Sequence, residues 1–223
     1  MQSYINDVTD EFIIFKEAIQ KYYQHEKNED FNNLTARGKE LIVSKLKETE
    51  EHLLWKRFLS QLKERFPDQI KSTTTSQEPS YSVEIQLENH QLPHLTNELK
   101  LVCSKSLFAP AYVIYGLEEV KIDREYDGAY KPYRFFGNLM KIVSPEGLIK
   151  PQFLLVKDMF SELFPSSKQV PFYLLDFKMR GLYLDNPLEE SSVFDCLFRG
   201  LGQSHIMIHG NPYYAKEEWQ EEQ

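Results

Sequence analysis

Asp176 and Lys178 are the two residues whose types and spacing best suit catalysis. They lie in the run Phe-Tyr-Leu-Leu-Asp-Phe-Lys-Met-Arg, residues 172–180, whose composition is typical of a β-strand. Side chains two residues apart project from the same face of a strand. The Asp176 carboxylate could hold Mg²⁺ or Mn²⁺, and the Lys178 ammonium could polarise a water molecule or stabilise charge developing on a phosphate.

This acid-x-Lys triplet resembles the (D/E)xK half of the site in restriction-endonuclease-like nucleases, over about 40 residues. The resemblance implies a metal-dependent nuclease in which Asp176 is the metal ligand. Such nucleases place a further acidic residue on an earlier strand, and the candidates here are Glu119, Asp123, Asp127 and Asp158. The alternative interpretation is that Asp176, Lys178 and Arg180 form charge pairs on the outer face of the strand.

Aromatic and basic residues alternate most densely in residues 126–136. This cluster contains Tyr126, Tyr130, Tyr133, Phe135 and Phe136, with Lys131 and Arg134 among them. Asp127-Gly128 indicates a hairpin turn, because both residue types tolerate positive φ, and Pro132 favours an edge strand. Tyrosine and arginine are favoured at interface hot spots, so Tyr126, Tyr130, Tyr133, Arg134 and Phe135 are candidate partner-binding residues. An ordinary hairpin with half of its rings in the core is the other interpretation.

The C-terminal stretch offers a second candidate contact. Residues 211–223 are rich in acidic side chains around Trp219, and a short helix there could use Trp219 as an anchor. An exposed tryptophan beside carboxylates would suit docking onto a basic partner.

The remaining chemistry-bearing residues favour structural roles. His205 and His209 would be about 13 Å apart on a strand, too far to share one zinc ion. Cys103 and Cys196 lie among apolar neighbours, so we expect buried, reduced thiols. Gly200 and Gly202 lie between a predicted helix and a predicted strand, an order that indicates a helix C-cap and not a phosphate loop. We therefore expect no cofactor, with Mg²⁺ or Mn²⁺ only in the nuclease alternative.

Composition narrows the function classes. The 223 residues carry a net charge of −8 and 13% aromatic residues, which excludes global disorder and disfavours sequence-independent nucleic-acid binding. The sequence has neither a basic start followed by an apolar stretch nor an apolar run long enough for a membrane span. We expect a cytoplasmic protein without a membrane contact.

Hydrophobic periodicity predicts the elements that must position these residues. Helical spacing covers 8–23 and 34–66, interrupted by the polar residues 47–52, which predicts an N-terminal helical hairpin over 1–66. A polar linker, 67–80, should follow, then an α+β domain over 81–210 and an acidic tail over 211–223. Alternation predicts strands at 81–88, 111–122, 172–180 and 204–209, and helices are expected at 93–104, 151–164 and 186–200.

The sequence thus predicts an α+β fold, in which a helical hairpin precedes a mixed or mainly antiparallel sheet packed with two or three helices. Because every catalytic constellation is incomplete, we expect a non-enzymatic protein–protein interaction or assembly subunit, one version being an acidic inhibitor of a basic partner. The partner should be a protein, and the helical hairpin could also support self-association. The metal-dependent nuclease using Asp176 and Lys178 is the alternative function.

Overall fold

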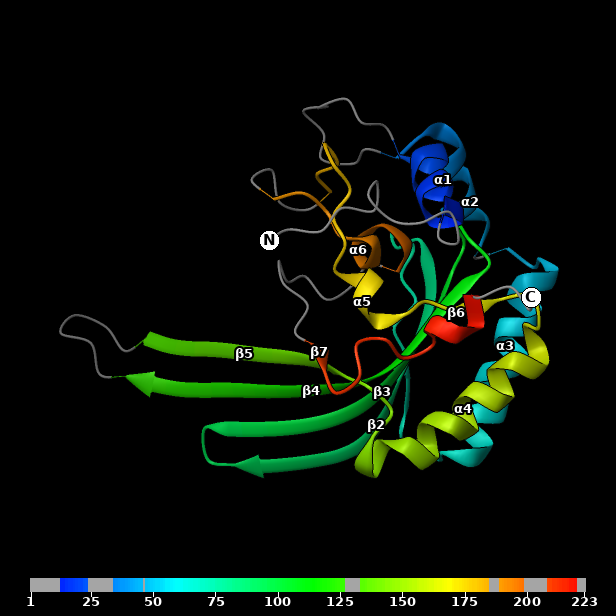
Figure 1. The fold of residues 1–223 in the computed structure, drawn as a ribbon. Helices are drawn as coiled ribbons and strands as arrows, with labels where there is room; N and C mark the ends of the chain where they lie inside the picture. Colours follow the sequence, from blue (N-terminus) through cyan, green and yellow to red (C-terminus); the bar gives the residue numbers. More distant parts are fainter. Residues whose placement is uncertain are drawn as a thin grey trace.

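Over the described residues the chain forms one seven-stranded sheet with helices on both faces (Figure 1). The computed structural model describes residues 13–23, 34–45, 47–126, 133–184, 189–198 and 208–219, and of 122–126, 133–142 and 208 it describes the backbone. The predicted mixed α+β character is confirmed.

The sheet is mainly antiparallel, as predicted, and its order is β1-β2-β3-β4-β5-β7. The long strands are β2 Ser80–Leu92, β3 Leu95–Ser106, β4 Ala111–Tyr126 and β5 Tyr133–Val143, with the short β1 Ile70–Ser72 beside β2. Two short strands pair in parallel: β6 Lys168–Gln169 with β4, and β7 Ile208–His209 with β5.

The prediction of a helix over 93–104 is wrong, because β3 occupies this stretch. Leu101 and Cys103 alternate with Val102 and Ser104, so the strand buries apolar side chains on both of its faces. Pro93 and His94 connect β2 to β3, since Leu92 pairs with Leu95. His94 has φ 71°, and proline followed by a residue at positive φ is typical of a type II turn.

The described helices are short to medium in length. They are α1 Ile13–Tyr22, α2 Ala36–Ser44, α3 Glu50–Arg65, α4 Lys150–Leu163, α5 Phe172–Leu175 and α6 Val193–Leu197, with 3₁₀ turns η3 Gly147–Ile149 and η4 Lys216–Trp219. Thr35 and Thr49 cap α2 and α3 by accepting hydrogen bonds from backbone N–H groups. Helix α4 matches the predicted helix 151–164 to within one residue, and the residues of its predicted apolar face are all buried.

Two hydrophobic cores lie on opposite faces of the sheet. On one face, Val102, Val113 and Tyr115 pack with side chains of α1, α2, α5 and α6. On the other face, Leu101, Cys103 and Ile114 pack with α3 and α4. Figure 1 shows α3 and α4 side by side, away from α1 and α2. Since α2 and α3 belong to different cores, the predicted hairpin over 1–66 is not seen as a separate unit.

Three further predictions differ from the structure. The expected strand over 172–180 is the helix α5 followed by irregular chain, with a single bridge between Lys178 and Ser192. Helix α6 begins at Val193, where a capping box formed by Ser192 and Asp195 starts it, and the described residues 189–192 of the helix expected over 186–200 are not helical. The segment expected as a linker, 67–80, contains the edge strand β1. Of the strand expected over 204–209, the structure describes Ile208–His209.

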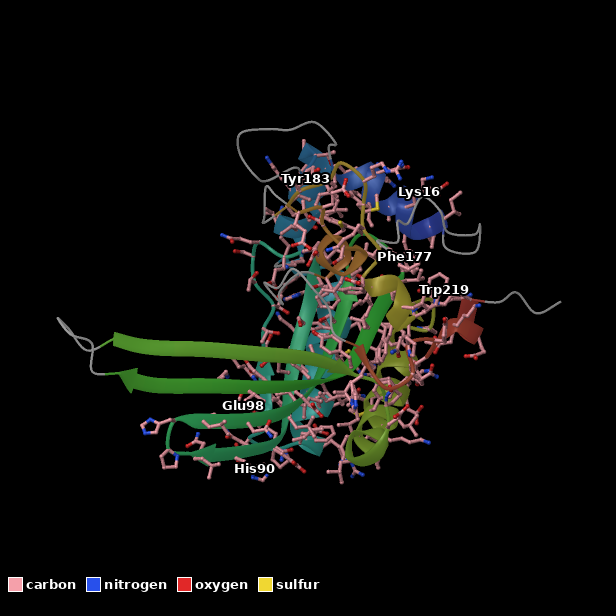
Figure 2. All side chains as sticks on the ribbon, turned by 60° about the vertical axis from the view of Figure 1, so that its left-hand side comes forward. Lys16, His90, Glu98, Phe177, Tyr183 and Trp219 are labelled. Atoms are coloured by element: carbon pink, nitrogen blue, oxygen red, sulfur yellow. The ribbon has the colours of Figure 1, made fainter. Side chains whose placement is uncertain are left out.

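The four long strands extend beyond both cores as an arm, defined as residues 86–99, 118–126 and 133–141. Burial along β2 falls from its start to its end, and Leu92 at the tip of the β2–β3 hairpin is 64% exposed. Figures 1 and 2 both show the β2–β3 and β4–β5 hairpins projecting from the helices, with His90 close to the end of the first.

Candidate functional site

The structure does not place Asp176 and Lys178 on one face. Asp176 follows the last residue of α5 and is exposed, whereas Lys178 is 5% exposed. The Lys178 ammonium lies 3.3 Å from a carboxylate oxygen of Glu189. The geometry that an acid-x-Lys strand would supply is therefore absent from these residues.

The proposed additional acids of a nuclease do not join Asp176 either. Glu119 lies on β4 in contact with two lysines, and Asp158 is exposed on α4, across the sheet from α5. Asp123 is described by its backbone alone, and Asp127 lies outside the described residues. Among the described residues, no three His, Cys, Asp or Glu side chains gather as a metal site would require. Cys103 and Cys196 are buried free thiols, as predicted.

The aromatic hairpin forms the far end of the arm. β4 and β5 pair antiparallel without a break from Gly116↔Val143 to Tyr126↔Tyr133, which confirms the predicted hairpin between these strands. β3 pairs with β4 only as far as Leu95↔Ile122. Beyond that point the arm tip, residues 123–126 and 133–136, is a two-stranded ribbon that places Arg134 opposite Glu125 and Phe135 opposite Arg124. Tyr130 lies outside the described residues.

Trp219 is an internal anchor in this structure. It is 8% exposed, its ring contacts Phe15 edge-on at 4.7 Å, and its indole N–H donates to the carbonyl of Gln169 at 2.7 Å. In Figure 2 it lies on the body of the molecule, away from the arm. Glu218 beside it accepts from Lys157 at 2.5 Å. These contacts fix η4 to α4 and β6, so Trp219 is not exposed for docking as the sequence suggested.

A network of five charged side chains crosses the root of the arm on one face. Lys100 lies 2.7 Å from Glu119 and 2.8 Å from Glu98, and Lys121 lies 2.9 Å from Glu98 and 3.1 Å from Glu119. Glu84 on β2 is 3.7 Å from Lys100. Burial opposes the ionisation of Glu98, but hydrogen bonds from Lys100 and Lys121 outweigh it and lower the pKa of Glu98 to about 2. The network joins three strands where the apolar core ends.

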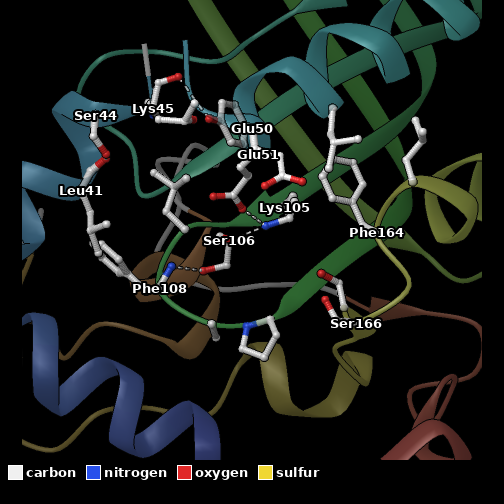
Figure 3. Close-up of a pocket in the computed structure, with 18 of the residues that line it drawn as sticks. Leu41, Ser44, Lys45, Glu50, Glu51, Lys105, Ser106, Phe108, Phe164 and Ser166 are labelled. Carbon is white, nitrogen blue, oxygen red and sulfur yellow. Dashed lines mark hydrogen bonds and ion pairs between the residues drawn. The ribbon is translucent and has the colours of Figure 1, made fainter. Parts of the chain in front are cut away.

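A groove of about 780 Å³ lies at the opposite end of the sheet from the arm, between the start of α3, the β3–β4 connection and the residues after α4. Apolar side chains form its walls and two lysines and several hydroxyl groups line it (Figure 3). Its apolar lining includes Leu41, Leu54, Leu107, Phe108, Leu163 and Phe164.

Lys105 lies at the floor of this groove. Its ammonium group donates to the Glu51 carboxylate and to the Ser106 carbonyl at 3.3 Å, and it lies 5.4 Å from the centre of the Phe164 ring. The Lys105 side chain is 7% exposed, whereas that of Glu51 is 43% exposed. Figure 3 shows the dashed contact from Lys105 to Glu51 in the middle of the groove.

Lys45 has a structural role at the edge of the same groove. Its buried ammonium donates to the backbone carbonyls of Glu78 and Ser80, the latter at 3.1 Å, and the Tyr81 hydroxyl donates to the Lys45 carbonyl at 3.1 Å. Burial lowers the pKa of Lys45 to about 8, against the opposing effect of Glu78. These bonds join the end of α2 to the start of β2.

Sequence reasoning missed this groove because its polar residues are distant in the chain. Glu51 and Lys105 meet only after α3 is packed on β3, and neither belongs to a local motif. The available signal was Lys105 between two serines, directly after the apolar run Leu101-Val102-Cys103 of β3.

Comparison with known proteins gives no relative from which a function could be transferred: no family model, curated protein or solved structure matches the chain. Among the described residues, no helix is both long and apolar enough to cross a membrane.

Proposed function

We propose that this protein is a non-enzymatic interaction or assembly subunit that engages a protein partner through the arm tip. The observation that carries this proposal is the projection of the β4–β5 ribbon beyond the last residue of β3 that pairs with it. An isolated two-stranded hairpin is marginally stable in water, because neither face has enough of the molecule to pack against.

The composition of the arm tip supports this role. Tyr126, Tyr133, Arg134 and Phe135 all lie in the ribbon that extends past β3. Aromatic residues are costly to leave in water and are enriched with arginine at interface hot spots. A partner that covers the tip would stabilise the ribbon, and aromatic and arginine side chains suit such a contact. The net charge of −8 would speed association with a basic partner, as expected of an acidic inhibitor.

The test is affinity capture from a lysate of the source cells with three forms of the protein: the wild type, Tyr133→Ser/Phe135→Ser, and Leu92→Ser. Leu92 is an exposed apolar residue at the tip of the neighbouring hairpin, so its variant makes a comparable change on the same arm. We expect one stoichiometric partner with the wild type and with Leu92→Ser, and loss of that partner with the double variant.

Equal capture by all three forms would remove the arm tip from the interface. Capture of no stoichiometric partner by the wild type would contradict the interaction role itself. Circular dichroism of each form must match the wild type, so that loss of capture reports the surface and not unfolding.

A further inference from the structure

The groove beside α3 contains a buried cation that is held by a partly exposed anion. Lys105 has lost nearly all its contact with water, and a buried ammonium without an anionic partner is strongly unfavourable. Glu51 supplies that partner from the first turn of α3. Because the Glu51 side chain is 43% exposed, another carboxylate can reach Lys105 from solvent once Glu51 turns outward.

The lining of the groove selects the kind of anion that could take this place. Leu54, Phe108 and Phe164 offer apolar contact, and the volume of about 780 Å³ lies within the range of small-molecule sites, roughly 300–1,000 Å³. Glu50 also lines the groove, so a doubly charged phosphate would face two carboxylates. A ligand with one carboxylate and an apolar body would replace the Glu51 carboxylate beside Lys105. The net charge at the floor of the groove would then stay the same.

We propose that this groove binds a small organic acid, whose carboxylate replaces that of Glu51 on Lys105 and whose apolar body contacts Leu54, Phe108 and Phe164. The site is separate from the arm tip and goes beyond the proposed interaction role. Glu51 is then a built-in competitor: it holds Lys105 when the groove is empty and weakens the apparent affinity for the acid, because the acid must displace it.

The competition can be measured with octanoate as the probe, by calorimetric titration of the wild type, Glu51→Gln and Glu50→Gln. Glu50→Gln is the matched control, since it removes the same charge from the same helical turn. We expect Glu51→Gln to bind octanoate about tenfold more tightly than the wild type, and Glu50→Gln to stay within about twofold. Octanoate should also raise the melting temperature of Glu51→Gln most, because its Lys105 has lost its carboxylate partner.

Two further measurements test the role of the charge. Octanol has the same apolar body without the carboxylate, and it should bind the wild type at least about tenfold more weakly than octanoate does. Lys105→Met should abolish octanoate binding if the variant folds; the Glu51 and Glu50 comparison stands without it. Equal affinity of octanoate for the wild type, Glu51→Gln and Glu50→Gln would overturn the proposal, as would the absence of binding to Glu51→Gln at millimolar octanoate.

Discussion

Glu98 shows how a single residue can couple the arm to pH. Its pKa of about 2 in the folded protein lies below its ordinary value of 4.5, because contacts with Lys100 and Lys121 outweigh the effect of burial. A carboxylate whose pKa is lowered by folding stabilises the native state above its unfolded pKa, and this stabilisation is lost as the pH falls toward the folded pKa. Glu98 therefore contributes fully near neutral pH.

We expect Glu98→Gln to flatten the dependence of unfolding free energy on pH between about 4.5 and 2, and to cost about 1 kcal/mol near neutral pH. Denaturant unfolding of the variant and the wild type across this range measures both effects. Glu88→Gln is the control, because Glu88 is exposed further along the arm. An identical pH profile for Glu98→Gln and the wild type would show that the network does not stabilise the arm.

Lys45 gives a pH dependence of the same sign in the alkaline range. Its folded pKa of about 8 lies below the ordinary 10.5, so the protonated ammonium is disfavoured by folding. The unfolded state then binds more protons between these two values, and stability should rise as the pH increases from about 8 to 10.5. Lys45→Met should remove this rise, and it should also leave the carbonyls of Glu78 and Ser80 without their donor. Proton uptake measured during unfolding at pH 9 checks the first effect, and denaturant titration at pH 7 checks the second.

At the scale of elements, the packing of α4 against its neighbours depends on one buried aromatic residue. Phe160 contacts the rings of Phe58 at 5.5 Å, Tyr112 at 4.3 Å and Phe164 at 4.7 Å, so it joins α4 to both α3 and the sheet. Phe160→Ala should lower the unfolding free energy by about 3–5 kcal/mol through lost burial and a residual cavity.

Leu154→Ala on the same helix is the matched control for Phe160→Ala. Leu154 is 43% exposed, and its truncation should cost less than about 1 kcal/mol. Chemical denaturation of both variants measures the difference. Similar losses of unfolding free energy for the two variants would mean that the face of α4 that contains Phe160 does not pack against the sheet.

The sequence predicts the elements whose burial follows one simple period. The pattern Phe153, Val156, Phe160 and Leu163 predicts α4 closely, since helical spacing and a wide apolar face agree there. It fails for residues 172–180, because the continuous apolar run 172–175 carries no period, and the helix α5 could not be told from a strand. β3 was mistaken for a helix for the same reason: it is buried on both faces at its C-terminal end.

Candidate sites can likewise be predicted only where a local pattern in the sequence indicates them. The aromatic hairpin was predicted because its residues are neighbours in sequence and Asp127-Gly128 indicates its turn. The groove was missed because its Lys105 and Glu51 are 54 residues apart, and their contact depends on the helix-to-sheet packing that no local pattern encodes.

At the scale of the whole molecule, the residues before β1 are part of both cores. Phe15, Ile19 and Tyr22 belong to one core, and Trp55 and Phe58 belong to the other. Deletion of residues 1–66 would remove large buried side chains from both faces of the sheet, a loss that exceeds the typical stability of a domain, about 5–15 kcal/mol.

We therefore expect the fragment 67–223 to be unfolded or molten, with poor dispersion in its amide spectrum and no cooperative thermal transition. A cooperative transition and a dispersed spectrum for this fragment would instead establish residues 67–223 as an independent domain. The result also decides whether loss of a partner on such a deletion can be interpreted as loss of a binding surface.

β4 gives the arm a mechanical property. The strand has 16 residues, about 54 Å at 3.4 Å per residue, and it runs from between the two cores to the arm tip. A partner that pulled on the tip along the strand direction would load the hydrogen bonds to β3 and β5 in shear, many at once, instead of opening them one at a time. The long strands would therefore transmit tension from the arm tip to the part of the sheet that is packed by helices on both faces.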